Sequence, residues 1–121
     1  MDIIATNRQA HFKYAILEKY EAGIELFGFE VKAIKTGHVN LAGSYVVIRG
    51  NEAWLLNAAI APYQVKNTPA GYDEVRSRRL LLRKAEIKEL IGRSAQKGLT
   101  LMPLRVYDKK SRVKLEFAIA R

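Results

Sequence analysis

Cysteine is absent from this 121-residue chain, so disulfide bonds and thiolate metal sites are excluded. No apolar run approaches the roughly 18 residues that a membrane-spanning helix needs. The first residues, 1–13, lack the apolar core of a signal peptide. We therefore expect a cytoplasmic protein that is neither exported nor bound to a membrane.

Residues suited to catalysis are also scarce. The chain has only two histidines, His11 and His38, which are far apart and not in a metal-binding spacing. No G-x-S-x-G, P-loop or G-x-G-x-x-G motif occurs. The glutamates between residues 18 and 30 alternate in a way that sends them to different faces, so no acid/base pair is indicated. We predict no enzymatic activity, metal site, cofactor or small-molecule substrate.

Positive charge is the strongest remaining feature. The net charge is +9, and a hydrophobic content of 49% fits one globular domain over residues 1–121. Residues 1–60 hold six Lys/Arg and six Asp/Glu, whereas residues 61–121 hold fifteen and six. Because the excess is confined to one half, we expect a polyphosphate partner, with an acidic membrane surface second. A basic surface without any partner is the third interpretation.

Period-two alternation predicts short strands along much of the chain. Ala22-Gly23 and Gly50-Asn51 are expected to be turns, and Pro103 implies an edge position or a bulge. The clearest alternation directs inward Val113, Leu115, Phe117 and Ile119. Strands are expected at residues 14–21, 24–27, 44–49, 52–56, 99–107 and 112–120.

Helical periodicity is confined to three segments. Helices are expected at residues 8–14 after Asn7 as N-cap, at 29–36 ended by Gly37, and at 83–97 ended by Gly98. Residues 61–75 have no clear period and predict a long loop, a feature that is often functional. Short strands in a domain of this size tend to remove their edges by closing. The sequence thus predicts a mainly β fold with helices, a closed antiparallel β-barrel of five to six strands with two to three helices.

The segment Asp73–Lys84, DEVRSRRLLLRK, sets five cations around three leucines. As a strand it would direct Arg76 and Arg78 to one face and Arg79 to the other. Two interpretations are open: positive side chains protect a strand edge from aggregation, or arginine forks follow a phosphate backbone. On the second, the leucines anchor the strand, and the phosphate ligands are Arg76, Arg78, Arg79 and Lys84.

Aromatic and acidic side chains supply further candidates. Bases stack on aromatic rings, although each single tyrosine fits the barrel core or rim as well, and Trp54 is expected in the core. Glu21 and Glu30 could cap a turn or lie in solvent, or they could accept hydrogen bonds from base edges and ribose hydroxyls. The aromatic candidates are Phe12, Tyr14, Tyr20, Tyr45, Tyr63 and Tyr72.

Several motifs, taken in order, resemble the SsrA-binding protein family, also called small protein B, from residue 7 to residue 121. The segment NRQAH at 7–11 resembles its opening Asn-(Lys/Arg)-x-Ala-x-His, and YEAGI at 20–24 resembles its Glu-Ala-Gly segment. EVK at 30–32, Gly37, and the residues NL and SYV after it resemble a Glu-Val-Lys-Ser…Gly…Asn-Leu-x-Asp-Ser-Tyr block. The rest is similar in EAWLLNAAIAPY, RSRRLLLRKAEIKELIG and KGLTLMPLRVY…RVKLEFAIAR.

The resemblance implies an OB-type barrel that binds the tRNA-like domain of transfer-messenger RNA (tmRNA) and delivers it to stalled ribosomes, the rescue process called trans-translation, without catalysis. It also implies RNA-binding positions. The charge of the segment Asp73–Lys84 adds four more, which the resemblance itself does not supply. The expected RNA-binding residues are Asn7, Arg8, His11, Glu21, Gly23, Lys35, Asn40, Tyr45, Arg76, Arg78, Arg79 and Lys84.

Three departures from the family pattern qualify these expectations. Tyr72-Asp73-Glu74 stands where the family usually reads His-Asp-Pro, and Gly43 replaces an Asp whose hydrogen bonds are lost. The family's basic tail does not follow Arg121, so we expect RNA binding without the element that resembles a sensor of the empty mRNA channel. The alternative from another class is a generic OB-fold module that binds single strands or a protein through its basic face.

Overall fold

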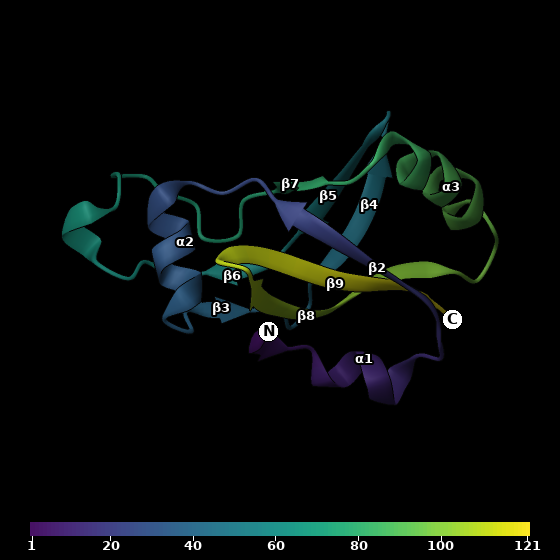
Figure 1. Cartoon of the computed structure of the whole chain (residues 1–121), viewed down its shortest axis with the longest axis horizontal. Helices are drawn as coiled ribbons and strands as arrows, with labels where there is room; N and C mark the ends of the chain where they lie inside the picture. Colours follow the sequence, from purple (N-terminus) through teal and green to yellow (C-terminus); the bar gives the residue numbers. More distant parts are fainter.

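Six antiparallel strands form a closed barrel at the centre of the molecule (Figure 1). The computed structural model describes residues 1–121. The barrel strands are β2 (Ile16–Ile24), β4 (Tyr45–Arg49), β5 (Glu52–Leu56), β7 (Arg78–Leu81), β8 (Thr100–Lys109) and β9 (Arg112–Ala120). Their order is β8-β4-β5-β7-β2-β9, and β9 pairs back with β8. The predicted mainly β class and closed barrel are confirmed.

Three short strands lie outside the barrel. β1 (Asp2–Thr6) pairs with the outer edge of β8. β3 (Val39–Asn40) and β6 (Ala59–Ile60) form a separate two-stranded sheet. None of the three was predicted, because each is too short or too irregular to produce a period-two signal.

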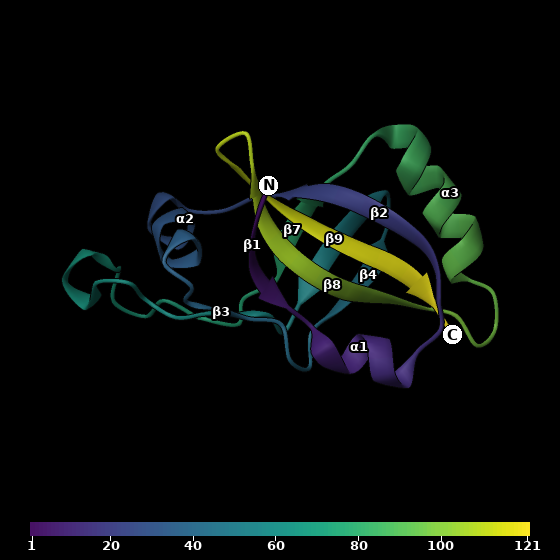
Figure 2. The same cartoon turned by 60° about the horizontal axis from the view of Figure 1, so that its bottom comes forward.

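The helices occupy different sides of the barrel. They are α1 (Arg8–Lys13), α2 (Gly28–Lys35) and α3 (Lys84–Ser94), with one 3-10 turn, η1 (Val65–Asn67), inside the predicted long loop. Figures 1 and 2 both place α2 and the loop at one end of the molecule and α3 at the other. α1 packs against the outside of the barrel, where Ala10 contacts Leu104 and Ala118. No helix has the length and apolar character needed to cross a membrane.

The barrel interior is filled by the alternating side chains of its strands. The inward-facing residues predicted for β9 are all buried in the main core. Tyr20 from β2 stacks on Phe117, with ring centroids 5.5 Å apart. Pro103 coincides with a register shift between β8 and β9, so the predicted bulge is confirmed. Gly37, with φ of +87°, follows the end of α2 as predicted.

The predicted turn at Ala22-Gly23 is wrong. β2 continues through both residues to Ile24, because Ala22 pairs with Leu115 and Gly23 with Lys114 of β9. The predicted return strand at 24–27 therefore does not exist. Pairing with a long neighbouring strand overrides the local turn preference of the two small residues.

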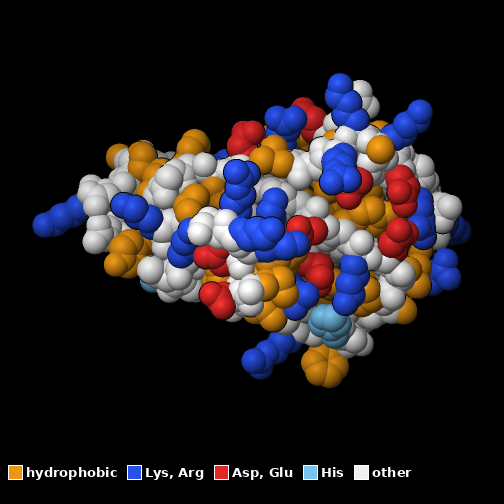
Figure 3. All heavy atoms as spheres, viewed as in Figure 1, with side chains coloured by type: hydrophobic (Ala, Val, Ile, Leu, Met, Phe, Trp, Pro, Cys, Tyr) orange, Lys and Arg blue, Asp and Glu red, His pale blue; other side chains and the backbone are white.

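Three other local predictions are also corrected. α3 ends at Ser94 rather than before Gly98, and its buried residue is Leu90. Trp54 is only half buried, since it lies on the outer face of β5 as the cross-strand partner of Arg79. Asn7 precedes α1 but its side chain makes no capping hydrogen bond. On the face shown in Figure 3, basic side chains are spread over the whole length, with acidic ones among them over the barrel.

Candidate functional site

Glu21 is a fixed, ionised acceptor on the outer face of β2. The hydroxyl of Tyr107 donates a hydrogen bond to its carboxylate, and Lys109 Nζ lies 3.2 Å from Oε2. The Tyr107 bond lowers the pKa of Glu21; partial burial opposes this, and Lys109 lowers the pKa further. Burial and the Glu21 carboxylate both raise the pKa of Tyr107, so it remains a donor. The Glu21 side chain is still 37% exposed, which leaves room for a ligand.

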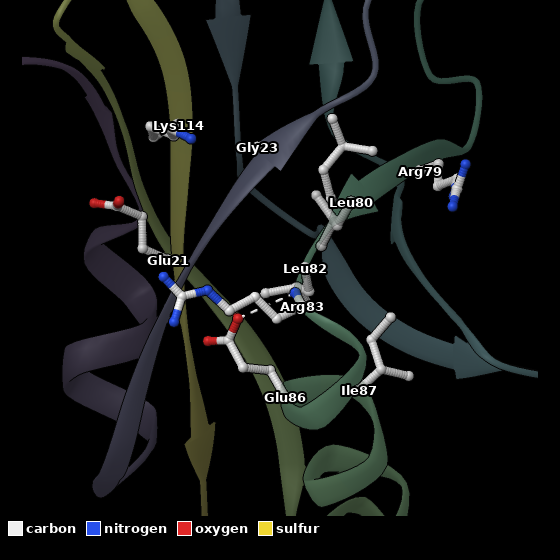
Figure 4. A pocket seen from close by; sticks show the side chains of 10 residues that line it. Glu21, Gly23, Arg79, Leu80, Leu82, Arg83, Glu86, Ile87 and Lys114 are labelled. Atoms are coloured by element: carbon white, nitrogen blue, oxygen red, sulfur yellow. Dashed lines mark hydrogen bonds between the residues drawn. The ribbon is translucent and has the colours of Figure 1, made fainter.

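A groove of about 580 Å³ opens beside Glu21, between β2, β7 and the start of α3 (Figure 4). A Cβ built on Gly23 would lie 3.4 Å from the Cβ of Leu81, so the missing side chain keeps the floor open. Leu81 is consequently 49% exposed. We call this the β2–α3 groove; its lining is Glu21, Gly23, Arg79, Leu80, Leu81, Leu82, Arg83, Glu86, Ile87 and Lys114.

Cations without ion-pair partners surround the β2–α3 groove. Figure 4 shows Arg83 extending from the β7–α3 junction toward β2, and Lys114 on β9 beyond Glu21. Neither forms a salt bridge, whereas Arg79 is held by Glu52 at 2.8 Å. Arg83 is the N-cap residue of α3, and its backbone N–H donates a hydrogen bond to Oε1 of Glu86. The groove thus holds two cations without salt bridges, Arg83 and Lys114, beside two carboxylates, Glu21 and Glu86.

A second hollow of about 600 Å³ continues the groove along α3. The two share Arg79, Leu82 and Ile87, and the second adds Lys84 and Lys88, which also lack ion pairs. Together they make a trough with an apolar floor and a basic rim. Such a trough can hold phosphates at the rim and pack a base or ribose on the floor, with Glu21 as the hydrogen-bond acceptor. No group of three His, Cys, Asp or Glu side chains is placed to hold a metal ion.

Arg78 is buried and bonded internally instead of lying on this surface. Its Nε and Nη2 lie 2.9 and 2.7 Å from Oε2 of Glu30, and its Nη1 is 2.8 Å from the carbonyl oxygen of Ala58. Both charged side chains have no exposed surface. Arg76 also donates to Glu30, and its guanidinium lies 4.1 Å above the ring of Phe27. The predicted phosphate contact of Arg78 has no accessible surface here, because alternation places it on the inner side of β7 with Leu80.

Four predicted residues of the N-terminal half, Asn7, Arg8, His11 and Tyr45, lie apart from the groove. Asn7 is buried, and its Nδ2 is 2.9 Å from the carbonyl oxygen of Pro103. Asn7 and Tyr45 line one hollow of about 310 Å³ that includes residues of α1, β4 and β8. Arg8 and His11 are exposed on α1. The structure therefore brings Asn7 and Tyr45 together, but not with the β2–α3 groove.

Asn40 and Lys35, the last two predicted residues, make contacts with nearby parts of the protein outside the groove. Asn40 Oδ1 accepts the backbone N–H of Ala42 at 2.9 Å, which shapes the turn after β3. Lys35 Nζ lies 3.2 Å from the carbonyl oxygen of Ser111 and 3.9 Å from Asp108. Of all the predicted residues, the β2–α3 groove and its continuation gather four: Glu21, Gly23, Arg79 and Lys84.

Comparison with known proteins identifies the family. A family model described as SmpB protein matches residues 4–121. The chain belongs to the SmpB family. An SsrA-binding protein from Trichodesmium erythraeum (strain IMS101) is 55% identical over 119 residues, which cover 98% of this chain and 76% of the relative. One from Sulfurihydrogenibium sp. (strain YO3AOP1) is 52% identical over 122 residues, 98% of this chain and 78% of the relative.

A solved structure supports the same assignment. It is described as "tmRNA-SmpB: a journey to the center of the bacterial ribosome" and matches with a TM-score of 0.78 and 44% identity. The match covers 97% of this chain and 82% of that one. The fold of the SmpB-family chain is thus that of a known SmpB.

Sequence reasoning missed two cations in the lining of the SmpB-family groove and the two residues that hold Glu21 in place. Arg83 was visible as one of five cations in its segment but was not selected. Lys114 was expected to face outward, which is correct, although nothing in its own segment connects it to Glu21. Tyr107 and Lys109, which fix the Glu21 carboxylate, lie 86 and 88 residues away, so no local pattern could reveal them.

Proposed function

We propose that this SmpB-family chain binds the tRNA-like domain of tmRNA and delivers it to stalled ribosomes, without catalysing a reaction itself. The observation that carries the proposal is 55% identity to an SsrA-binding protein across nearly the whole chain. The structural match to an SmpB described with tmRNA and the ribosome supports the same partners. A protein with these partners works in the cytoplasm.

In this proposal the β2–α3 groove receives the RNA. The Glu21 carboxylate, already aligned by Tyr107, accepts a hydrogen bond from a base edge or a ribose 2′-hydroxyl. Exposed Leu81 offers an apolar contact on the floor. Arg83 and Lys114 bind phosphates, since neither is engaged by a carboxylate of the protein.

Seven other predicted residues have different roles in this proposal. Arg8, His11 and Tyr45 are exposed and are proposed as a separate contact on the α1 side of the protein. Asn7 and Arg78 are buried, and they act by holding the positions of other residues. Lys84 extends the phosphate track along α3, whereas Arg79 is oriented by Glu52 at its edge.

The test is a gel-shift titration of the full chain against the tRNA-like domain of tmRNA, beside an unrelated folded RNA, at several salt concentrations. Tight binding to the first that survives an excess of the second is expected. Equal and steeply salt-dependent binding to both would show that charge alone acts, and a generic OB-fold module would be the better account.

A further inference from the structure

Figures 1 and 2 place α2 and the long loop at the end of the molecule away from α3. Two hollows lie there, and neither shares a residue with the β2–α3 groove. One, of about 360 Å³, is lined by Gly28, Phe29, Lys32, Tyr63, Gln64 and Asn67. The other, of about 320 Å³, shares Phe29 with the first, and its lining includes Phe27, Tyr72, Asp73 and Arg76. We call the surface formed by these residues, together with Lys66, the α2–loop platform.

The buried ion pair of Glu30 and Arg78 holds the platform in place through Tyr72. The Tyr72 hydroxyl donates a hydrogen bond to Glu30 Oε2 at 2.9 Å and accepts one from Arg78. It also lies 3.0 Å from the carbonyl oxygen of Ile60. The ring of Phe29 meets that of Tyr72 edge-on, with centroids 4.9 Å apart. Burying a carboxylate and a guanidinium has a large desolvation cost. Here the arrangement fixes a long loop against α2, which reduces the entropy that a ligand loses by ordering it.

The exposed groups of the platform suit a nucleobase. Tyr63 is 48% exposed, and its ring is steadied by an edge contact with His38 at 5.9 Å. Asn67 Nδ2 donates to Gln64 Oε1, so the two amides are aligned with each other. The remaining Gln64 NH₂ and the Asn67 carbonyl oxygen have no protein partner, and they present a donor and an acceptor side by side. An aromatic face beside such a pair matches the stacking and edge recognition of an unpaired base.

Charge on the platform favours the same ligand. Residues 61–72 contain no Asp or Glu, and the one acid in the lining of either hollow, Asp73, accepts the backbone N–H of Val75. The sole acid of α2 is Glu30, which is buried and neutralised by two arginines. The exposed charges of α2 and these loop residues are thus all positive: Lys32, Lys35 and Lys66. Figure 3 agrees, because its left-hand tip shows blue and orange side chains and no red ones.

We propose that the α2–loop platform is a second RNA-binding surface, which takes an unpaired base of a single-stranded segment on Tyr63 and the Gln64–Asn67 amides. Lys32 and Lys66 contact the flanking phosphates. The platform and α3 lie at opposite ends of the molecule, so one chain holds two RNA segments at once. The segment belongs either to a part of tmRNA outside the tRNA-like domain or to ribosomal RNA.

The probe for this proposal is a single-stranded RNA hexamer that carries one 2-aminopurine. It is titrated into the full chain with the tRNA-like domain present in excess, so that the β2–α3 groove is occupied. Stacking on Tyr63 quenches the probe. Tyr63→Ala weakens hexamer binding about tenfold and removes the quench, whereas Tyr63→Phe, which keeps the ring, stays within about twofold. Lys32→Ala makes the negative slope of log affinity against log salt less steep by about 0.7.

Controls separate this surface from the groove and identify the source of the RNA. Lys97→Ala, an exposed lysine near α3, leaves hexamer binding unchanged. Tyr63→Ala leaves the affinity for the tRNA-like domain unchanged, so failure of one proposal does not imply failure of the other. Displacement of the hexamer by full-length tmRNA or by small ribosomal subunits shows which RNA supplies the segment.

Two results would overturn the proposal. One is hexamer binding that is equal in Tyr63→Ala and Lys97→Ala, or unaccompanied by a quench. The other is weaker binding of Tyr63→Ala to ribosomal subunits with no change in hexamer binding, which would make the partner a protein.

Discussion

Arg78 and Glu30 form an ion pair inside the molecule, with Nη2 2.7 Å from Oε2 and no exposed surface on either side chain. The pair joins β7 to α2, and through Tyr72 it also holds the long loop. A charge that a sequence would assign to the surface is thus part of the internal framework. The two surfaces that we propose for RNA binding lie on either side of that framework.

Glu30→Gln is expected to lower the free energy of unfolding by about 3–5 kcal/mol. The change removes one partner and leaves the guanidinium of Arg78 buried without its counter-ion. Urea denaturation followed by circular dichroism measures the loss. Glu25→Gln is the matched control: Glu25 is 64% exposed and pairs with Arg79 at 3.7 Å, so its loss costs less than about 1 kcal/mol. Equal effects of the two changes would show that the buried pair is not the framework.

The Glu30 network also predicts acid sensitivity. Burial raises the pKa of Glu30, but hydrogen bonds from Arg76, the Phe27 backbone, Arg78 and Tyr72 outweigh it and lower the pKa from 4.5 to about 2. A folded-state pKa below the unfolded one stabilises the protein fully above about pH 4.5, and this stabilisation is lost as the pH falls toward 2. The amount is on the order of 3 kcal/mol.

The measurement is the unfolding free energy of wild type and Glu30→Gln from pH 5.5 to 2.5. Since other carboxylates titrate in both proteins, the difference between them isolates Glu30. That difference narrows as the pH falls. A constant difference over the range would mean that Glu30 keeps an ordinary pKa.

Much of the barrel was predictable because its information is local. The alternation of β9 and the hairpin of β4 and β5 need only neighbouring residues. The same alternation already put Arg78 on the side of Leu80, which is in the core. What no local pattern supplies is the carboxylate 48 residues earlier that makes the burial of Arg78 possible.

The candidate site was predictable only in part, for the same reason. The family resemblance supplied Glu21 and Gly23, and charge supplied Arg79 and Lys84. The groove itself arises because β2 runs straight through Ala22-Gly23 and so brings Glu21 beside the start of α3. A turn at those residues, as the local signal indicated, would have separated them.

Glu21→Gln is expected to weaken binding of the tRNA-like domain about ten- to hundredfold. The change keeps the shape but removes the charge, and hydrogen bonds to charged groups contribute about 1.5–3 kcal/mol. Filter binding or gel shift at fixed salt measures the effect. Glu18→Gln, on the same strand and paired with Arg93, serves as the control and keeps wild-type affinity. If both variants bind like wild type, Glu21 does not touch the RNA.

Arg83→Ala is expected to change the salt dependence of tRNA-like domain binding. Loss of one phosphate contact makes the negative slope of log affinity against log salt less steep by about 0.7–0.9. Lys97→Ala removes the same charge from an exposed position outside both hollows, so its slope stays that of wild type. Titrations at four or more salt concentrations give the two slopes. Identical slopes for the two variants would assign Arg83 to general attraction rather than to a phosphate contact.

Gly23→Val is expected to block the β2–α3 groove without destabilising the fold. A Cβ at Gly23 meets Leu81 Cβ at 3.4 Å and Cδ1 at 3.5 Å, which is ordinary contact, and the backbone is not left-handed. A β-branched residue suits a strand, so the unfolding free energy stays within about 1 kcal/mol of wild type. The added methyl groups fill the floor beside Glu21, and affinity for the tRNA-like domain falls by at least about tenfold. Gly92→Ala, which adds a methyl to open space on α3, leaves affinity unchanged. A stable Gly23→Val protein with wild-type affinity would place the RNA elsewhere, because no base or ribose could then occupy the groove floor.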